Sequence, residues 1–272
     1  MSCLAEQAKI LFAEAEENNL DWGAKNPRFR RWDTCSLCEQ KYHGVVACAL
    51  SWACWKTYLG RPETDQLRGM AMDLLGGGLF HADRHEDALA VREANLAMLL
   101  RTGAPEEQVL AVQGNLGNSY HTHGQSEKGL RMLREVYLRY LKLDGEIPRT
   151  LMAASNYAST LNELERFEEA KPVMRKTIPV AQCDVGESNE LTLKMRSIYA
   201  QALYMDDGAT LDDFREAVET LEDATRIARR VLGATNPITD GIERQLRASR
   251  VALSDASTIT DAFAAMAPPG KS

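Results

Sequence analysis

The chain has 272 residues, a net charge of −7 at pH 7, 44% hydrophobic residues and 26% charged residues. Proteins that bind nucleic acid through its phosphates need a basic stripe, so this acidic balance predicts that nucleic acid is not a partner. No stretch approaches the length and apolarity of a membrane span, and the start lacks the pattern of a signal peptide. The six cysteines therefore predict mostly free thiols in a reducing compartment, and we expect a cytoplasmic location without membrane insertion.

The N-terminal part predicts two small units. Residues 1–27 predict an N-terminal helix over residues 3–18 followed by a linker, because Asn, Gly and Pro break the apolar pattern there. Residues 28–60, rich in cysteine and tryptophan, predict a degenerate helical hairpin whose break lies near residues 42–44.

A repeat occupies residues 61–254. Four copies of a signature pair a large apolar residue with Gly or Ala: Leu75-Gly76, Leu116-Gly117, Tyr157-Ala158 and Tyr199-Ala200, at steps of 41, 41 and 42 residues. A second small residue follows each copy: Ala88, Gly129, Ala170 and Ala217. Side chains larger than methyl at facing points would push two helix axes apart, so the paired signatures predict stacked helical hairpins.

The predicted helices of this part follow one another in pairs. The hairpins pair residues 65–80 with 84–101, 106–122 with 126–143, 149–163 with 167–182, and 189–205 with 211–232, and a last helix covers residues 237–254. An unpaired last helix can cap the final hairpin by covering its apolar face. Pro172 and Pro179 fall inside a predicted helix and indicate a kink there rather than a broken repeat. Residues 255–272 are expected to form a flexible tail.

These signatures resemble tetratricopeptide repeats, in which the usual period is about 34 residues. The longer period here is similar to the kinesin-light-chain type, as are the linkers at residues 59–64 and 231–239, which are similar to that subfamily's Leu-Gly-x-x-His-Pro-x-Thr sequence. The resemblance covers residues 65–254 well and residues 28–60 weakly. It implies an all-α, right-handed α-solenoid of about five helical hairpins with a C-terminal capping helix. The heptad region that joins a light chain to its motor is absent, so the resemblance does not imply a motor subunit.

The resemblance also implies peptide binding in a concave groove lined by the first helix of each hairpin. Repeats of the kinesin-light-chain type often carry, two residues before the small residue, an Asn that contacts the peptide backbone, and Asn115 and Asn156 match it. A primary amide both donates and accepts hydrogen bonds, which suits an extended peptide. Further polar residues are expected on the same faces: Asn118, Ser159, Asn162, Lys194 and Gln201. The alternative is that these side chains bond to neighbouring helices and bind no partner.

A zinc site is the second interpretation of the N-terminal part. Cys35 and Cys38 form a Cys-x2-Cys pair, with His43, Cys48 and Cys54 close in sequence. Structural zinc needs four tetrahedral ligands, and the sequence has no second Cys-x2-Cys pair. We therefore expect no metal and a first hairpin packed with thiol and tryptophan side chains.

Other residues that could carry chemistry have simpler explanations. His81, His85, His121 and His123 lie near hairpin turns one repeat apart, and we expect them to be exposed turn residues rather than a metal site. The run from Gly76 to Gly78 lacks the preceding strand and the Gly-Lys-Ser/Thr ending of a phosphate-binding loop.

The sequence therefore predicts a non-catalytic protein-interaction module that holds a partner protein or peptide in its groove and needs no cofactor. Two alternatives remain open at this point. One is a structural spacer or assembly subunit of a larger complex, and the other is a zinc-binding regulator that uses the segment from Cys35 to Cys54.

Overall fold

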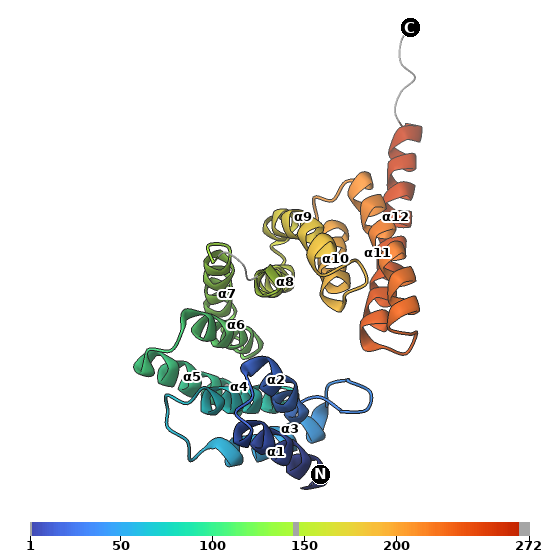
Figure 1. Cartoon of the computed structure of the whole chain (residues 1–272). Coiled ribbons are helices and arrows are strands. Elements are labelled where there is room, and N and C mark those ends of the chain that lie inside the picture. The colour runs from blue at the N-terminus through green and yellow to red at the C-terminus, as the bar shows by residue number, and fades with distance from the viewer. Residues whose placement is uncertain (1, 144–146, 267–272) are drawn as a thin grey trace. The chain divides into compact units, whose positions relative to one another are not determined.

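The computed structural model describes residues 2–143 and 147–266, with side chains described for 3–143 and 147–258. These residues form twelve α-helices, one short 3-10 helix and no strand, so the fold class is all-α as predicted (Figure 1). The chain divides into two compact units, residues 1–132 and 133–272, which are described separately below.

Unit 1 is built from helices in chain order. They are α1 (Ser2–Glu17), α2 (Trp22–Phe29), the 3-10 helix η1 (Arg30–Trp32), α3 (Gly44–Tyr58), α4 (Gln66–Phe80), α5 (His85–Thr102), α6 (Glu106–Thr122) and the start of α7 (Ser126–Tyr140). The predicted hairpin of residues 65–101 is the pair α4 and α5, and α6 and α7 begin where predicted. Successive helices from α3 to α6 pack on each other.

Unit 2 continues the pattern after α7. It contains α8 (Ile147–Glu163), α9 (Phe167–Asp184), α10 (Glu190–Tyr204), α11 (Leu211–Val231) and α12 (Pro237–Met266). The predicted hairpins are the pairs α8 with α9 and α10 with α11. The last helix α12 packs on α10 and α11, which agrees with the predicted cap.

The predicted boundary between the last helix and the C-terminal tail needs correction. Helix α12 continues to Met266, beyond the predicted end at residue 254, so residues 255–266 are helical and not a tail. The rest of the predicted tail, residues 267–272, lies outside the described residues. Helix α9 runs without interruption through Pro172 and Pro179, so the repeat is unbroken there, as predicted.

The predicted hairpin over residues 28–60 is wrong. Helix α2 begins at Trp22 in the expected linker, because the Asp21 side chain caps it by accepting a hydrogen bond from the Ala24 amide at 2.8 Å. Residues 33–43 form a loop, which an isolated bridge between Thr34 and Lys41 closes. Between this loop and residue 60 there is one α-helix, α3, and not the expected pair.

Aromatic packing explains this departure from the local sequence signals. Phe12 of α1 meets Phe29 of α2 edge-on, with ring centroids 5.7 Å apart, and Trp32 of η1 meets Tyr58 of α3 at 6.3 Å. All four rings are buried in one cluster. Contacts between residues this far apart in sequence give no periodic signal. The Asn and Pro residues of the segment 18–27 therefore predicted a linker where helix α2 forms.

The small residues of the repeat lie where helices approach closely, as predicted. A Cβ atom on Gly129 of α7 would stand 2.5 Å from the carbonyl oxygen of Gly117 in α6. A Cβ atom on Gly76 of α4 would stand 2.9 Å from the Cγ atom of Arg92 in α5. A Cβ atom on Gly77 would meet nothing within 4 Å. The glycines therefore have different roles within one helix.

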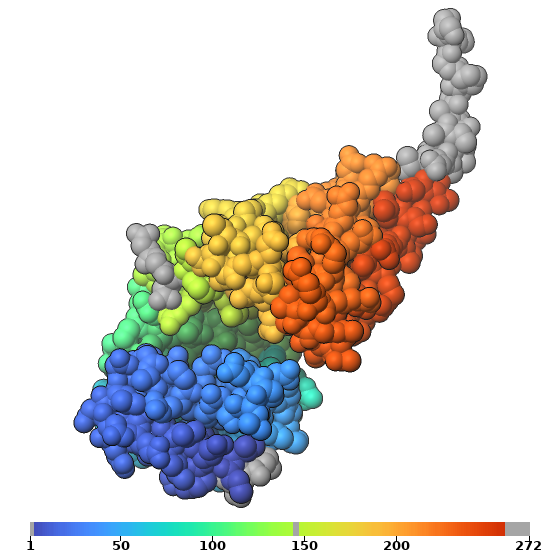
Figure 2. Space-filling view, turned by 45° about the vertical axis from the view of Figure 1, so that its right-hand side comes forward, coloured from blue at the N-terminus to red at the C-terminus, as the bar shows by residue number. Residues whose placement is uncertain are grey.

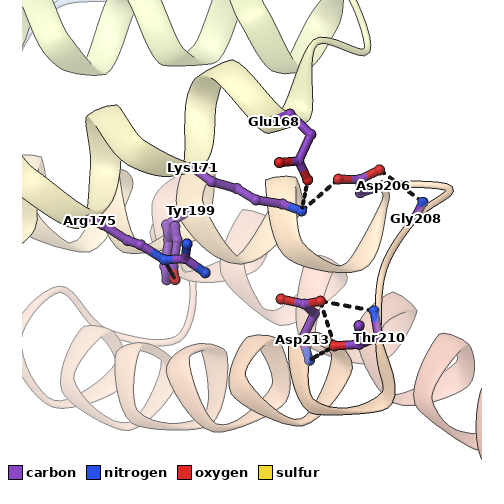
Figure 3. A network of polar contacts seen from close by, with 8 residues as sticks. All are labelled: Glu168, Lys171, Arg175, Tyr199, Asp206, Gly208, Thr210 and Asp213. Atoms are coloured by element: carbon purple, nitrogen blue, oxygen red, sulfur yellow. Dashed lines mark hydrogen bonds and ion pairs between the residues drawn. The ribbon is translucent and has the colours of Figure 1, made fainter.

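A buried cation anchors the long turn between α10 and α11 in unit 2 (Figure 3). Lys171 of α9 is 6% exposed, and its Nζ donates to Asp206 at 2.5 Å and to Glu168 at 2.7 Å. The Asp206 carboxylate also accepts the Gly208 amide at 3.0 Å. Thr210 then caps α11 in a reciprocal capping box with Asp213. The turn of residues 205–210 is therefore held at both ends.

Within unit 2 a second polar chain connects three helices, and Figure 3 shows its first two members, Arg175 and Tyr199. The Arg175 guanidinium of α9 donates to the Tyr199 hydroxyl of α10 at 2.7 Å, and that hydroxyl donates to Glu216 of α11 at 2.7 Å. Burial raises the pKa of Tyr199, so the hydroxyl keeps its proton near neutral pH.

Candidate functional site

In unit 2 the first helices of successive hairpins are neighbours. Helix α10 packs against both α8 and α12. The fully described second helices α9 and α11, in contrast, make no comparable contact with each other. Helices that approach more closely lie on the inner side of a curved stack. The inner face of unit 2, defined here as the exposed sides of α8, α10 and α12, is therefore formed by the helices that the sequence predicted to line the groove. In the space-filling view, yellow α10 adjoins orange α11 (Figure 2).

A hollow of about 480 Å³ opens on this inner face between α10 and α12. Lys194, one of the predicted groove residues, lines it with an exposed side chain, next to Ser197 and Tyr204. The Ser197 hydroxyl donates to the Gln245 side chain of α12 at 2.5 Å. The hollow thus offers a lysine ammonium group, an aromatic hydroxyl and one side-chain amide to a ligand from outside.

The structure places the other predicted residues of unit 2 on α8 and α10. Asn156 and Ser159 of α8 are half-buried, and the Ser159 hydroxyl donates to Glu163 at 3.3 Å. Gln201 of α10 is half-buried, and its amide nitrogen points to the Met205 sulfur at 3.4 Å. These three side chains keep polar atoms at or near the surface.

Asn162 differs from this group. It is 4% exposed, and its amide nitrogen donates to the Ile198 carbonyl of α10 at 2.8 Å. This bond ties α8 to α10, which is the alternative role that the sequence left open. We therefore exclude Asn162 from the candidate surface.

Unit 1 carries the remaining two predicted residues, Asn115 and Asn118 on α6, both half-buried. The Asn115 amide nitrogen donates to the Asp73 carboxylate of α4 at 2.9 Å. Asn115 therefore connects two first helices within unit 1, and its amide is already engaged.

Two cavities open on α4 in unit 1. The apolar cavity, of about 270 Å³, is lined by Phe29, Met70, Leu74, Leu99 and Val112 among others. The polar cavity, of about 250 Å³, contains side chains from the loop after η1 and from three helices: Lys41, His43, Asp73, His81, Arg92 and Asn115.

The ionisable groups of the polar cavity influence one another. Burial raises the pKa of Asp73, and the Asn115 hydrogen bond and the Arg92 charge oppose that rise. Burial lowers the pKa of His81, and the nearby His43, Lys41 and Arg92 lower it further. His81 was expected to be a simple turn residue, so this cavity was missed. The available signal was Arg92, a charged residue at helical spacing from Ala88 and Leu99 on the buried face of α5.

The cysteines of the alternative zinc interpretation are dispersed over a loop and a helix. Cys35 and Cys38 lie in the loop of residues 33–43, while Cys48 and Cys54 lie on α3. Cys54 is buried in the aromatic cluster, and burial raises the pKa of its thiol, which disfavours the thiolate that zinc binds. Over the described ranges, no three Cys, His, Asp or Glu side chains gather closely enough to hold a metal ion.

No helix in the described part of the chain combines the length and apolarity needed to cross a bilayer. No family model matches the sequence, and no curated protein matches it.

Solved structures with a similar fold are known. The crystal structure of a putative kinesin light chain with nearly identical TPR-like repeats from Podosopora anserina matches 84% of this chain and 96% of its own, at 17% identity and a TM-score of 0.52. A crystal structure of a point variant of that protein matches over the same shares with a TM-score of 0.54. BtubC (BKLC) from P. vanneervenii matches 83% of this chain and 94% of its own, at 13% identity and a TM-score of 0.58. The chain therefore has a tetratricopeptide-like helical-repeat fold, similar to that of kinesin-light-chain-type repeats.

Proposed function

We propose that the chain is a non-catalytic protein-interaction module that holds a partner protein or peptide on the inner face of unit 2. The observation that carries this proposal is the hollow between α10 and α12, which Lys194, Ser197 and Tyr204 line. Stacked helical hairpins expose extended surfaces of this kind and use them for binding.

The chemistry of the inner face supports a peptide or protein as the partner. Asn156 and Ser159 on α8 present side-chain amide and hydroxyl groups beside the hollow's helix α10. Such groups can bond to the backbone of an extended segment, while the Lys194 ammonium group would pair with an acidic side chain. Rim charges of this type mainly set the rate and specificity of association.

We further propose that the protein acts in the cytoplasm. All six cysteines lie within the described side chains and are unpaired, including the exposed Cys3, Cys38 and Cys183. Free exposed thiols are typical of a reducing compartment.

A matched pair of charge reversals tests the proposal. Lys194 lies exposed on α10 at the hollow, and Lys176 lies exposed on the second helix α9. Lys194→Glu is expected to weaken capture of the native partner about tenfold or more, since like charges at an interface cost several kcal/mol. Lys176→Glu should leave capture unchanged. Affinity capture from native cells with quantitative mass spectrometry measures both variants, and circular dichroism checks their helix content.

The opposite pattern would contradict the proposal. If Lys194→Glu captures the same proteins at wild-type levels, the partner binds elsewhere, for example at an edge or an end, as a structural spacer would.

A further inference from the structure

The polar cavity of unit 1 holds a buried cation without an ion pair. Arg92 is 6% exposed, and its guanidinium donates to two neutral groups, the Asn115 carbonyl at 3.0 Å and the Ser119 hydroxyl. Its Nε atom is buried without a hydrogen-bond partner. Arginine stays charged in proteins, and a buried charge is costly unless an opposite charge compensates it.

Further basic groups share this cavity. Lys41 and His43 come from the loop after η1, and His81 follows the end of α4. None of the three side chains forms an ion pair with any described residue. Burial lowers the pKa of His81, and the nearby His43, Lys41 and Arg92 lower it further. The loop that carries Lys41 and His43 is positioned by the Thr34–Lys41 bridge and by the Tyr42 amide, which donates to the Asp33 carbonyl at 2.8 Å.

Two carboxylates also line the cavity, and neither pairs with Arg92. Asp73 accepts the Asn115 amide at 2.9 Å, and Asp33 accepts the Thr34 hydroxyl at 2.7 Å. The cavity thus contains four basic side chains and two acidic ones. Asp73 acts on the most buried cation, Arg92, through its charge but forms no ion pair with it.

We propose that this cavity binds an oxyanion, a phosphate or carboxylate group, which pairs with Arg92 and is held at its rim by Lys41, His43 and His81. A guanidinium and a phosphate or carboxylate form short, charge-assisted hydrogen bonds. The volume of about 250 Å³ is smaller than the pockets of about 300–1,000 Å³ that hold drug-sized ligands, which suits one small group. The oxyanion is either a free ion or a group carried by a partner peptide. This site lies in unit 1 and does not depend on the function proposed for unit 2.

Calorimetric titration of the full chain with inorganic phosphate tests the proposal, with sodium chloride at matched ionic strength as the blank. Wild type is expected to bind phosphate saturably, and Lys41→Ala and His81→Gln are each expected to weaken binding about tenfold, since each removes one charge-assisted hydrogen bond to the anion. Lys56→Ala on α3, an exposed lysine away from the cavity, should bind like wild type. The Arg92→Gln variant should bind no phosphate if it folds. If this variant does not fold, Lys41→Ala and His81→Gln still test the proposal.

A second readout separates the anion effect from a change in fold. Bound phosphate should raise the pKa of His81, measured by NMR of its ring nitrogens, because an anion stabilises the imidazolium. A blocked peptide that contains glutamate is the second probe. Binding of phosphate alone assigns the site to a free ion, and binding of the peptide that depends on Lys41 assigns it to a partner's side chain. Binding of neither probe, or binding indifferent to Lys41→Ala and His81→Gln, overturns the proposal.

Discussion

Gly129→Ala is expected to destabilise unit 1 by about 1–3 kcal/mol, the range for overpacking a close helix contact. The new methyl group would stand 2.5 Å from the Gly117 carbonyl oxygen and 2.9 Å from the His121 amide nitrogen, both of which are backbone atoms that cannot rotate away. The effect opposes helix propensity, because alanine is favoured over glycine in a helix by about 1 kcal/mol.

Gly77→Ala is the matched control within the repeat. Gly77 lies in the middle of α4 with open space at its Cβ position. There the same substitution should stabilise by about 0.5–1 kcal/mol, because the unfolded chain loses conformational freedom and nothing clashes. Denaturant unfolding, followed by circular dichroism, measures both. Equal shifts of the two midpoints in the same direction would show that close helix approach is not what the glycine at position 129 provides.

Lys171→Met is expected to cost about 3 kcal/mol in unit 2, because removing one partner leaves a largely buried carboxylate without its cation. The Asp206 side chain is 14% exposed and keeps only the Gly208 amide as a partner. Lys176→Met on the same helix removes an exposed cation, so its effect should stay within about 0.5 kcal/mol. Denaturant unfolding of the two variants at pH 7 makes the comparison.

The pH dependence gives the Lys171 prediction a second test. The hydrogen bond from Lys171 lowers the pKa of Asp206 from 3.8 to about 2. A carboxylate with a depressed pKa stabilises the fold above the pKa of the unfolded chain, and this contribution is lost as the pH falls through the folded value. The difference between wild type and Lys171→Met should therefore be constant above about pH 4 and shrink toward pH 2. A difference that stays constant down to pH 2 would show that Lys171 acts by packing and not through the Asp206 carboxylate.

The helical hairpins could be predicted because their signals are local and periodic. Gly117 and Gly129 are twelve residues apart in one hairpin, and their spacing recurs in the neighbouring ones. The start of a helix can also be predicted where its capping residue is adjacent in sequence. Asn189 is an example, because its side chain accepts a hydrogen bond from the Leu191 amide at the start of α10. For these elements local propensity and tertiary packing favour the same structure.

The N-terminal part and the polar cavity could not be predicted in the same way. Helix α2 and the loop of residues 33–43 depend on Trp32 and Phe12 meeting across distant segments, which no period reveals. The cavity depends on Arg92 of α5 reaching Asn115 of α6 beside a loop from residues 41–43. Asn162 was assigned to the groove because it lies on a first helix. The sequence does not reveal that its side-chain amide points toward α10, where it donates to the Ile198 carbonyl.

The inner face of unit 2 is the proposed recognition surface, and lysine labelling of the captured complex tests this proposal most directly. Lys194 and Lys176 are both exposed in the free chain, so an acylating reagent should modify both of them. In the complex, mass spectrometry is expected to find Lys194 protected and Lys176 modified as before. Unchanged labelling of Lys194 together with protection of Lys176 would contradict the account and place the partner on the second helices instead.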